Sequence, residues 1–150
     1  MKVLAVCLGN ICRSPLAEGI LAHKNQAYSL GWEVDSAGTA AYHVGELPDS
    51  RSISMAAKYG IDITNQRARQ FKVIDFDRFD KILVMDRSNY GNVLSLARNE
   101  EDRKKVELIL NYSKPGADKE VPDPYWDDNG FEHVYQLLDE ATEVFIKENS

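Results

Sequence analysis

A chain of 150 residues, 43% of them apolar, has material for one hydrophobic core, so we expect a single domain over residues 1–150. The net charge of −6, without a basic stripe to compensate it, argues against a nucleic-acid partner. The apolar runs are too short to cross a bilayer and no signal-peptide pattern precedes the first strand, which favours a cytoplasmic protein without a membrane partner.

Hydrophobic periodicity predicts strands that alternate with helices. Strands are expected over residues 2–7, 32–36, 81–85 and 106–109. Helices are expected over residues 15–28, 52–59, 88–98 and 131–147, with a short helical turn near Val73 and loops over 38–48 and 114–128. This order predicts an α/β fold, in which a four-stranded parallel sheet carries helices on both faces, as in a flavodoxin-like three-layer sandwich. Ligands of such sheets bind beyond the carboxyl ends of the strands.

The stretch over residues 6–15, Val-Cys-Leu-Gly-Asn-Ile-Cys-Arg-Ser-Pro, joins the first strand to the first helix. We expect its backbone N–H groups, the helix N-terminus and the Arg13 guanidinium to converge on a small oxyanion. Cys7, at the base of this turn, should then be a nucleophilic thiolate at neutral pH. The phosphate-binding loop predicted in this way consists of Leu8, Gly9, Asn10, Ile11, Cys12, Arg13 and Ser14.

The two cysteines also have a structural interpretation, because free cysteines are commonly small buried apolar residues. The complete pattern around Cys7, together with an acid candidate late in the chain, favours the catalytic interpretation. Two cysteines five residues apart fit a reducing compartment better than a disulfide scaffold, and the three histidines are scattered. No metal and no other cofactor is therefore expected.

Residues 6–15 resemble the active-site signature of the low-molecular-weight protein tyrosine phosphatases. The resemblance covers nearly the whole chain, through residues 34–39, 68–70, 85–86 and 123–125. It implies hydrolysis of phosphotyrosine monoesters in a protein substrate through a cysteinyl-phosphate intermediate on Cys7. It also implies that Arg13 binds the phosphate and that Asp123 is the general acid and base. The aromatic walls that the resemblance implies are Tyr42, Tyr125 and Trp126.

Three residues of the predicted site have two interpretations each. Asp123 lies between two prolines, whose fixed φ angles would hold its carboxyl group over the pocket, although the same residues suit a surface turn. Ser14 can donate a hydrogen bond to Cys7, or it can cap the first helix. Asp86 can orient Arg13, or it can cap the helix that follows it.

The resemblance further implies that Asn10 ties the loop together through Ser36 and a histidine. This chain has Gln66 where animal members of the family carry that histidine. Ile11 offers an apolar wall to a phenyl ring and no acceptor to a guanidinium, which favours phosphotyrosine over phosphoarginine. Cys12, one loop turn from the nucleophile, is expected to capture the oxidised form of Cys7 as a disulfide.

Other functions remain open. A protein-arginine phosphatase is the nearest alternative, because it shares the loop and the acid and differs at the residue before the second cysteine. An arsenate reductase would need a further cysteine after Cys12, and none follows. A non-catalytic phosphate-binding module would need neither Cys7 nor Asp123. Nucleotide binding is not expected, because neither G-x-x-x-x-G-K-[ST] nor G-x-G-x-x-G occurs in the sequence. The sequence does not identify the physiological substrate; a monomer or a weak dimer is expected.

Overall fold

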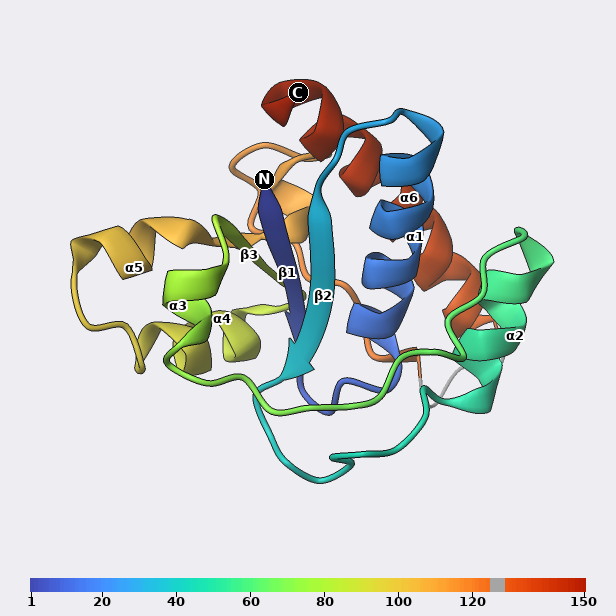
Figure 1. The fold of residues 1–150 in the computed structure, drawn as a ribbon, viewed down its shortest axis with the longest axis horizontal. Helices are drawn as coiled ribbons and strands as arrows, with labels where there is room; N and C mark the ends of the chain where they lie inside the picture. Colours follow the sequence, from blue (N-terminus) through green and yellow to red (C-terminus); the bar gives the residue numbers. More distant parts are fainter. Residues whose placement is uncertain (125–128) are drawn as a thin grey trace.

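The computed structural model describes residues 1–124 and 129–150, and it contains a four-stranded parallel sheet in the order β2-β1-β3-β4. The strands are β1 (Lys2–Cys7), β2 (Glu33–Gly38), β3 (Lys81–Val84) and β4 (Val106–Leu108). The helices are α1 (Arg13–Ala27), α2 (Ser50–Lys58), α3 (Asp75–Arg78), α4 (Arg87–Leu94), α5 (Glu100–Lys105), the 3-10 helix η1 (Ile109–Asn111) and α6 (Gly130–Asn149). In Figure 1 the sheet stands between α1, α2 and α6 on its right and α3, α4 and α5 on its left, which confirms the predicted α/β class.

The central strand β1 contributes to both halves of the core, because successive side chains of a strand point to opposite faces. Val3, Ala5 and Cys7 belong to the buried cluster that includes residues of α1 and α6. Leu4 and Val6 belong to the cluster on the other face, which includes residues of α3 and α4. The last residue of β1 therefore reaches the carboxyl end of the sheet on the side that α1 covers.

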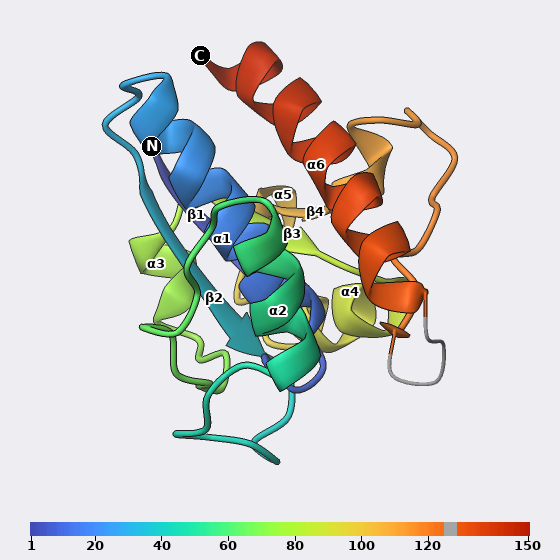
Figure 2. The same cartoon turned by 90° about the vertical axis from the view of Figure 1, so that its right-hand side faces the viewer.

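Parallel pairing brings the carboxyl ends of the strands to one end of the sheet. Cys7 lies opposite Gly38 of β2, and Val6 lies opposite Val84 of β3. The turn into α1 and the loop after β2 leave the sheet at this end, the lower end in Figure 2. The described part of the chain has no helix long and apolar enough to cross a membrane.

Three helical segments differ from the prediction. The helix predicted over 88–98 ends at Leu94, and neither α5 nor η1 was predicted. The sequence of α5 is charged throughout, so it gives no apolar periodicity. It is stabilised locally instead, because Asn99 accepts a hydrogen bond from the N–H of Asp102 at 2.9 Å. Acidic residues fill its first turn and basic residues its last, as the helix dipole favours.

Candidate active site

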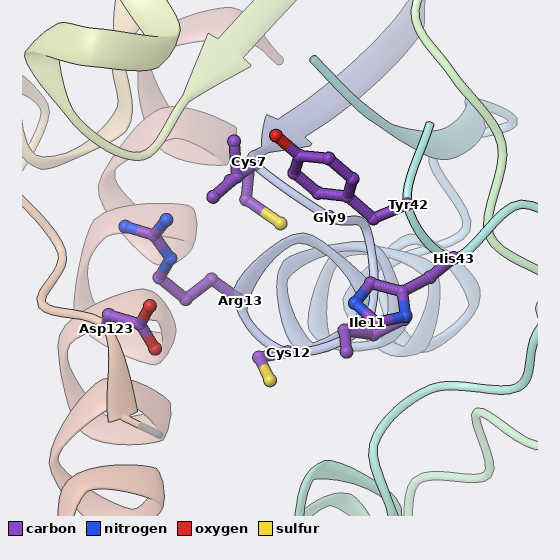
Figure 3. A pocket seen from close by; sticks show the side chains of 9 residues that line it. Cys7, Gly9, Ile11, Cys12, Arg13, Tyr42, His43 and Asp123 are labelled. Atoms are coloured by element: carbon purple, nitrogen blue, oxygen red, sulfur yellow. The ribbon is translucent and has the colours of Figure 1, made fainter. Parts of the chain in front are cut away.

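A hollow of about 130 Å³ lies at the carboxyl end of β1, beside the N-terminus of α1 (Figure 3). The residues that line it are Cys7, Leu8, Gly9, Ile11, Cys12, Arg13, Tyr42, His43 and Asp123. They come from the turn between β1 and α1, from the loop after β2 and from the segment before α6. We refer to this cavity as the Cys7 hollow.

The turn between β1 and α1 is tied to the loop that follows β2. The N–H groups of Thr39 and Ala40 donate to the carbonyl oxygens of Cys7 and Leu8, each at 2.9 Å. Gly38 permits this close approach, because a Cβ atom at its position would lie 2.7 Å from the Leu8 carbonyl oxygen. The turn thus presents the positive end of α1 beside Cys7, whose side chain is buried, and this end of a helix favours an anion.

Asn10 holds the turn from within. Its backbone is left-handed, with a φ of 57°, a conformation that asparagine adopts more readily than most residues with a side chain. Its Nδ2 donates to the Oγ atoms of Ser14 at 2.8 Å and Ser36 at 2.9 Å, and its Oδ1 accepts from the N–H of Arg69 at 3.0 Å. Because Ser14 Oγ accepts from Asn10, its own proton can point to Cys7 Sγ, 3.1 Å away.

The structure decides between the two uses of Ser14. Helix α1 begins at Arg13, and the residue before it makes no hydrogen bond that caps the helix with a side chain. Ser14 lies inside the first turn and is fully buried against Cys7 and Asn10. The interpretation of Ser14 as the helix cap is therefore wrong, because its hydroxyl group is engaged inside the turn.

Asp86 serves both of the purposes considered for it. Its Oδ2 accepts a hydrogen bond from Nη1 of Arg13 at 2.8 Å, and its Oδ1 accepts one from the N–H of Asn89, which caps α4. Nη1 of Arg13 also donates to the carbonyl oxygen of Val121 at 2.9 Å. The guanidinium, with the Arg13 residue only 5% exposed, is therefore fixed, and neither of these bonds uses its Nε or Nη2 donors.

Asp123 lines the Cys7 hollow from the segment that precedes α6. Two residues earlier, the N–H of Val121 donates to the carbonyl oxygen of Met85 at 2.8 Å, next to β3. The bond from Arg13 to the Val121 carbonyl fixes the same residue a second time. Figure 3 shows the Asp123 carboxylate on the same side of the hollow as Arg13. A carboxyl group held there can exchange a proton with a group bound in the hollow.

A model of the low molecular weight phosphotyrosine protein phosphatases matches residues 2–149. The chain belongs to this family. It is 40% identical to the low molecular weight phosphotyrosine protein phosphatase of Schizosaccharomyces pombe, with 98% of this chain and 96% of the relative covered. The human protein of the same name is 39% identical, with 97% of this chain and 94% of the relative covered.

Solved structures resemble this phosphatase closely. A Drosophila arginine phosphatase superposes with a TM-score of 0.93 at 35% identity, covering 100% of this chain and 98% of the other. A protein tyrosine phosphatase from Entamoeba histolytica gives a TM-score of 0.92 at 36% identity, covering 99% and 96%. The fold therefore does not distinguish phosphotyrosine from phosphoarginine, and the choice of substrate must be argued from the residues around the hollow.

The rim of the Cys7 hollow contains two of the walls expected from the sequence. Ile11 and Tyr42 both line it, and Tyr42 is 77% exposed, so little of the phosphatase covers its ring. The other two expected walls, Tyr125 and Trp126, lie outside the described residues. Apolar surface at the rim is therefore contributed by the turn itself and by the loop after β2.

His43 also lines the hollow of the phosphatase, and sequence reasoning did not select it. Its ring is paired with the carboxylate of Glu46 and lies over Gly9, where a Cβ atom would come within 3.1 Å of the ring. The only signal for His43 in the sequence was its place beside Tyr42 in a loop expected near the site.

Glu18 is the second residue that sequence reasoning missed, because it lies off the apolar side of the helix predicted over residues 15–28. In the phosphatase it is partly buried, and its Oε1 accepts a hydrogen bond from Ser36 Oγ at 2.6 Å. Burial raises the pKa of Glu18 to about 7; the Ser36 hydrogen bond and the charge of Arg69 oppose the rise, and Asp35 adds to it. A carboxyl group that titrates near neutral pH is thus connected to the turn.

Gln66 stands where the family resemblance implied a histidine. Its Nε2 donates to the carbonyl oxygen of Pro15 at 3.1 Å, and its Oε1 is buried without a hydrogen-bond partner among residues 1–124 and 129–150. The acceptor of Asn10 is satisfied by the backbone of Arg69 instead. In this phosphatase, Glu18 and Arg69 therefore complete the arrangement around Asn10.

Proposed function

We propose that this phosphatase hydrolyses phosphotyrosine monoesters of protein substrates through a cysteinyl-phosphate intermediate on Cys7. The observation that carries the proposal is the meeting of Cys7, Arg13 and Asp123 around one hollow at the N-terminus of α1. A thiolate, a fixed guanidinium and a carboxyl group are what phosphoryl transfer to and from sulfur requires. On this proposal, residues 1–150 act as one domain on cytoplasmic phosphoproteins, as a monomer or weak dimer.

In the first step the Cys7 thiolate attacks phosphorus in line with the tyrosyl oxygen. The sulfur–phosphorus bond forms, the phosphorus–oxygen bond breaks, and Asp123 gives its proton to the departing phenolate. The N–H groups of the turn and the Arg13 guanidinium stabilise the charge on the equatorial oxygens. Asp86 supports this role, because its bond to Nη1 fixes the guanidinium without using the Nε and Nη2 donors.

In the second step a water molecule attacks the phosphocysteine. The Asp123 carboxylate takes a proton from the water, the new phosphorus–oxygen bond forms, and the sulfur–phosphorus bond breaks to release inorganic phosphate. The leaving group is the Cys7 thiolate. Ser14 supports this step, because its hydroxyl group can donate a hydrogen bond to the thiolate sulfur 3.1 Å away.

The rim favours phosphotyrosine as the substrate. Ile11 and Tyr42 present apolar and aromatic surface to a flat phenyl ring. A phosphoarginine side chain carries a polar guanidino group, whose burial against Ile11 without an acceptor is unfavourable. Phosphoarginine is the second candidate, because the Drosophila arginine phosphatase has so similar a structure.

Hydrolysis of phosphotyrosine, phosphoserine and phosphoarginine peptides, measured side by side, tests the proposal. We expect the phosphotyrosine peptide to be hydrolysed fastest, and Cys7→Ser to bind phosphate and remain folded without turnover. Cys12→Ser is the control for Cys7→Ser, because it makes the same substitution in the same hollow. Burial raises the pKa of Cys12 to about 12, the charge of Asp49 adds to the rise, and the thiol therefore stays protonated. Turnover by a folded Cys7→Ser protein would remove Cys7 from its role.

A further inference from the structure

The side-chain amide of Asn10 is the branching point of two similar arms. One N–H bond of Nδ2 leads to Ser14 Oγ and on to the sulfur of Cys7, over distances of 2.8 and 3.1 Å. The other leads to Ser36 Oγ and on to the carboxyl group of Glu18, over distances of 2.9 and 2.6 Å. Each arm therefore runs from an amide through a hydroxyl group to an acidic group.

The direction of the hydrogen bonds in both arms follows from the backbone. The N–H of Arg69 donates to Oδ1 of Asn10, so the amide nitrogen is the atom that faces the two serines. Each serine oxygen accepts one amide N–H, and its single proton must point away from Asn10. The proton of Ser36 then requires an acceptor, and Glu18 provides it. Without that acceptor the Ser36 arm would no longer be oriented.

We propose that Glu18 is a positioning residue for the Cys7 nucleophile, acting through Ser36, Asn10 and Ser14, and that gain or loss of a proton on Glu18 changes the activity. This inference rests on the proposed phosphatase function of Cys7. A charged acceptor forms a stronger hydrogen bond than a neutral one, by roughly a factor of two in energy. The ionised carboxylate thus holds Ser36, and through it Asn10, more firmly than the protonated form does.

The surroundings allow Glu18 to titrate near neutral pH. Burial raises its pKa to about 7, and the charge of Asp35 on β2 adds to the rise, while the Ser36 hydrogen bond and Arg69 oppose it. His23 on α1 and Asp62 on the segment after α2 are titratable groups that line the same hollow of about 280 Å³ as Glu18. This hollow shares no lining residue with the Cys7 hollow, so protons can reach Glu18 independently of the substrate.

Gln66 shares a hollow with Glu18. It lines the same 280 Å³ hollow, and its Oε1 is a buried acceptor without a partner in the described part of the chain. A protonated carboxyl group gains an O–H donor, which this acceptor can receive. The ionised form of Glu18 accepts from Ser36, and the hollow that Glu18 lines also contains an acceptor residue, Gln66.

The test compares wild type with Glu18→Gln, which preserves side-chain length and an acceptor for Ser36 but cannot ionise. We expect kcat of the variant on an aryl phosphate to match wild type near pH 6 and to fall about 3- to 10-fold below it at pH 8, the scale of one charge-assisted hydrogen bond made neutral. The ratio of the kcat values of the two enzymes does not depend on the ionisation of the substrate, because that ionisation is the same for both. Asp62→Asn, in the same hollow but without a bond to Ser36, should give a ratio that is flat with pH.

A second measurement separates this inference from the proposed function. Alkylation of Cys7 by iodoacetamide, localised by tandem mass spectrometry, needs no phosphatase activity. We expect the ratio of its rates in Glu18→Gln and wild type to change at least about twofold between pH 6 and 8. If alkylation shows this change and no phosphoester is hydrolysed, the proposed function fails and the positioning role stands. If both ratios are flat with pH, Glu18 has only a structural role and the inference is overturned.

Discussion

Replacing Glu18 with glutamine should make the stability of the folded protein less dependent on pH. Burial raises the pKa of Glu18 from 4.5 to about 7 in the folded protein, and the unfolded chain has the ordinary value. The folded protein therefore binds this proton more tightly, so the associated stability is fully present below pH 4.5 and declines as the pH rises to 7. At about 1.4 kcal/mol for each pKa unit, the decline is about 3 kcal/mol.

Glutamine cannot ionise, so the variant lacks this decline. Relative to wild type we expect Glu18→Gln to have a similar free energy of unfolding at pH 5 and a higher one at pH 8, by up to about 3 kcal/mol. Urea denaturation at both pH values measures this, because a shifted midpoint with an unchanged slope reports stability alone.

The control for this experiment is Asp62→Asn. Hydrogen bonds from Thr64 lower the pKa of Asp62, so its carboxylate is ionised in the folded and unfolded chain at both pH 5 and pH 8. The difference between this variant and wild type should therefore not change between the two pH values. An equally constant difference for Glu18→Gln would refute the reasoning, because it would show that Glu18 does not change its charge in this range.

Four further substitutions or treatments test the site. Arg13→Lys should lower kcat/KM by about 10²–10³-fold or more, since an ammonium cannot supply the bidentate fork; near-normal kinetics would show that charge alone suffices. Asp123→Asn should slow substrates with poor leaving groups by about 10²–10⁴-fold and activated aryl phosphates much less, whereas equal losses would argue against proton donation. Ile11→Thr should shift the ratio of phosphotyrosine to phosphoarginine hydrolysis toward phosphoarginine by about 10–200-fold, and an unchanged ratio would remove Ile11 from specificity. Mild peroxide should produce a Cys7–Cys12 disulfide that thiols reverse, and because burial raises the pKa of Cys12 to about 12, its thiolate and the rate of capture should increase from pH 7 to pH 9; mass spectrometry that finds only overoxidised Cys7 would contradict this.

Local sequence patterns were sufficient to predict the strands of the sheet and the turn around Cys7. Strand alternation and the strand-turn-helix order depend on neighbours within a few residues, so β1, the turn and α1 could be predicted from residues 2–28 alone. Helix α5 could not, because its stability comes from the Asn99 cap and from charges matched to the helix dipole, not from an apolar face. Periodicity gives no signal for such a helix, and the helix propensity of its Glu, Arg and Lys residues is only a weak one.

The contacts that complete the site join residues far apart in the sequence. Glu18 meets Ser36 across 18 positions, and Asn10 meets the backbone of Arg69 across 59. Periodicity assigned Glu18 to the polar side of its helix, correctly as a helix position, but it could not show that β2 would present a hydroxyl group there. The substitution of Gln66 for a histidine was visible in the sequence, and its consequence depended on which other groups the fold brings to Asn10.

The ties that hold the turn around Cys7 also bear on how the protein folds. The turn depends on Gly38 at the end of β2 and on Arg69 beyond α2, so it cannot become ordered until β2 has docked on β1 and the segment around Arg69 has docked on the end of β2. Contacts of such long sequence separation form late and together with the rest of a domain. A reactive thiol in this environment is therefore a reporter of complete folding. Destabilising substitutions in distant strands should reduce the number of active molecules and leave the turnover of each folded molecule unchanged.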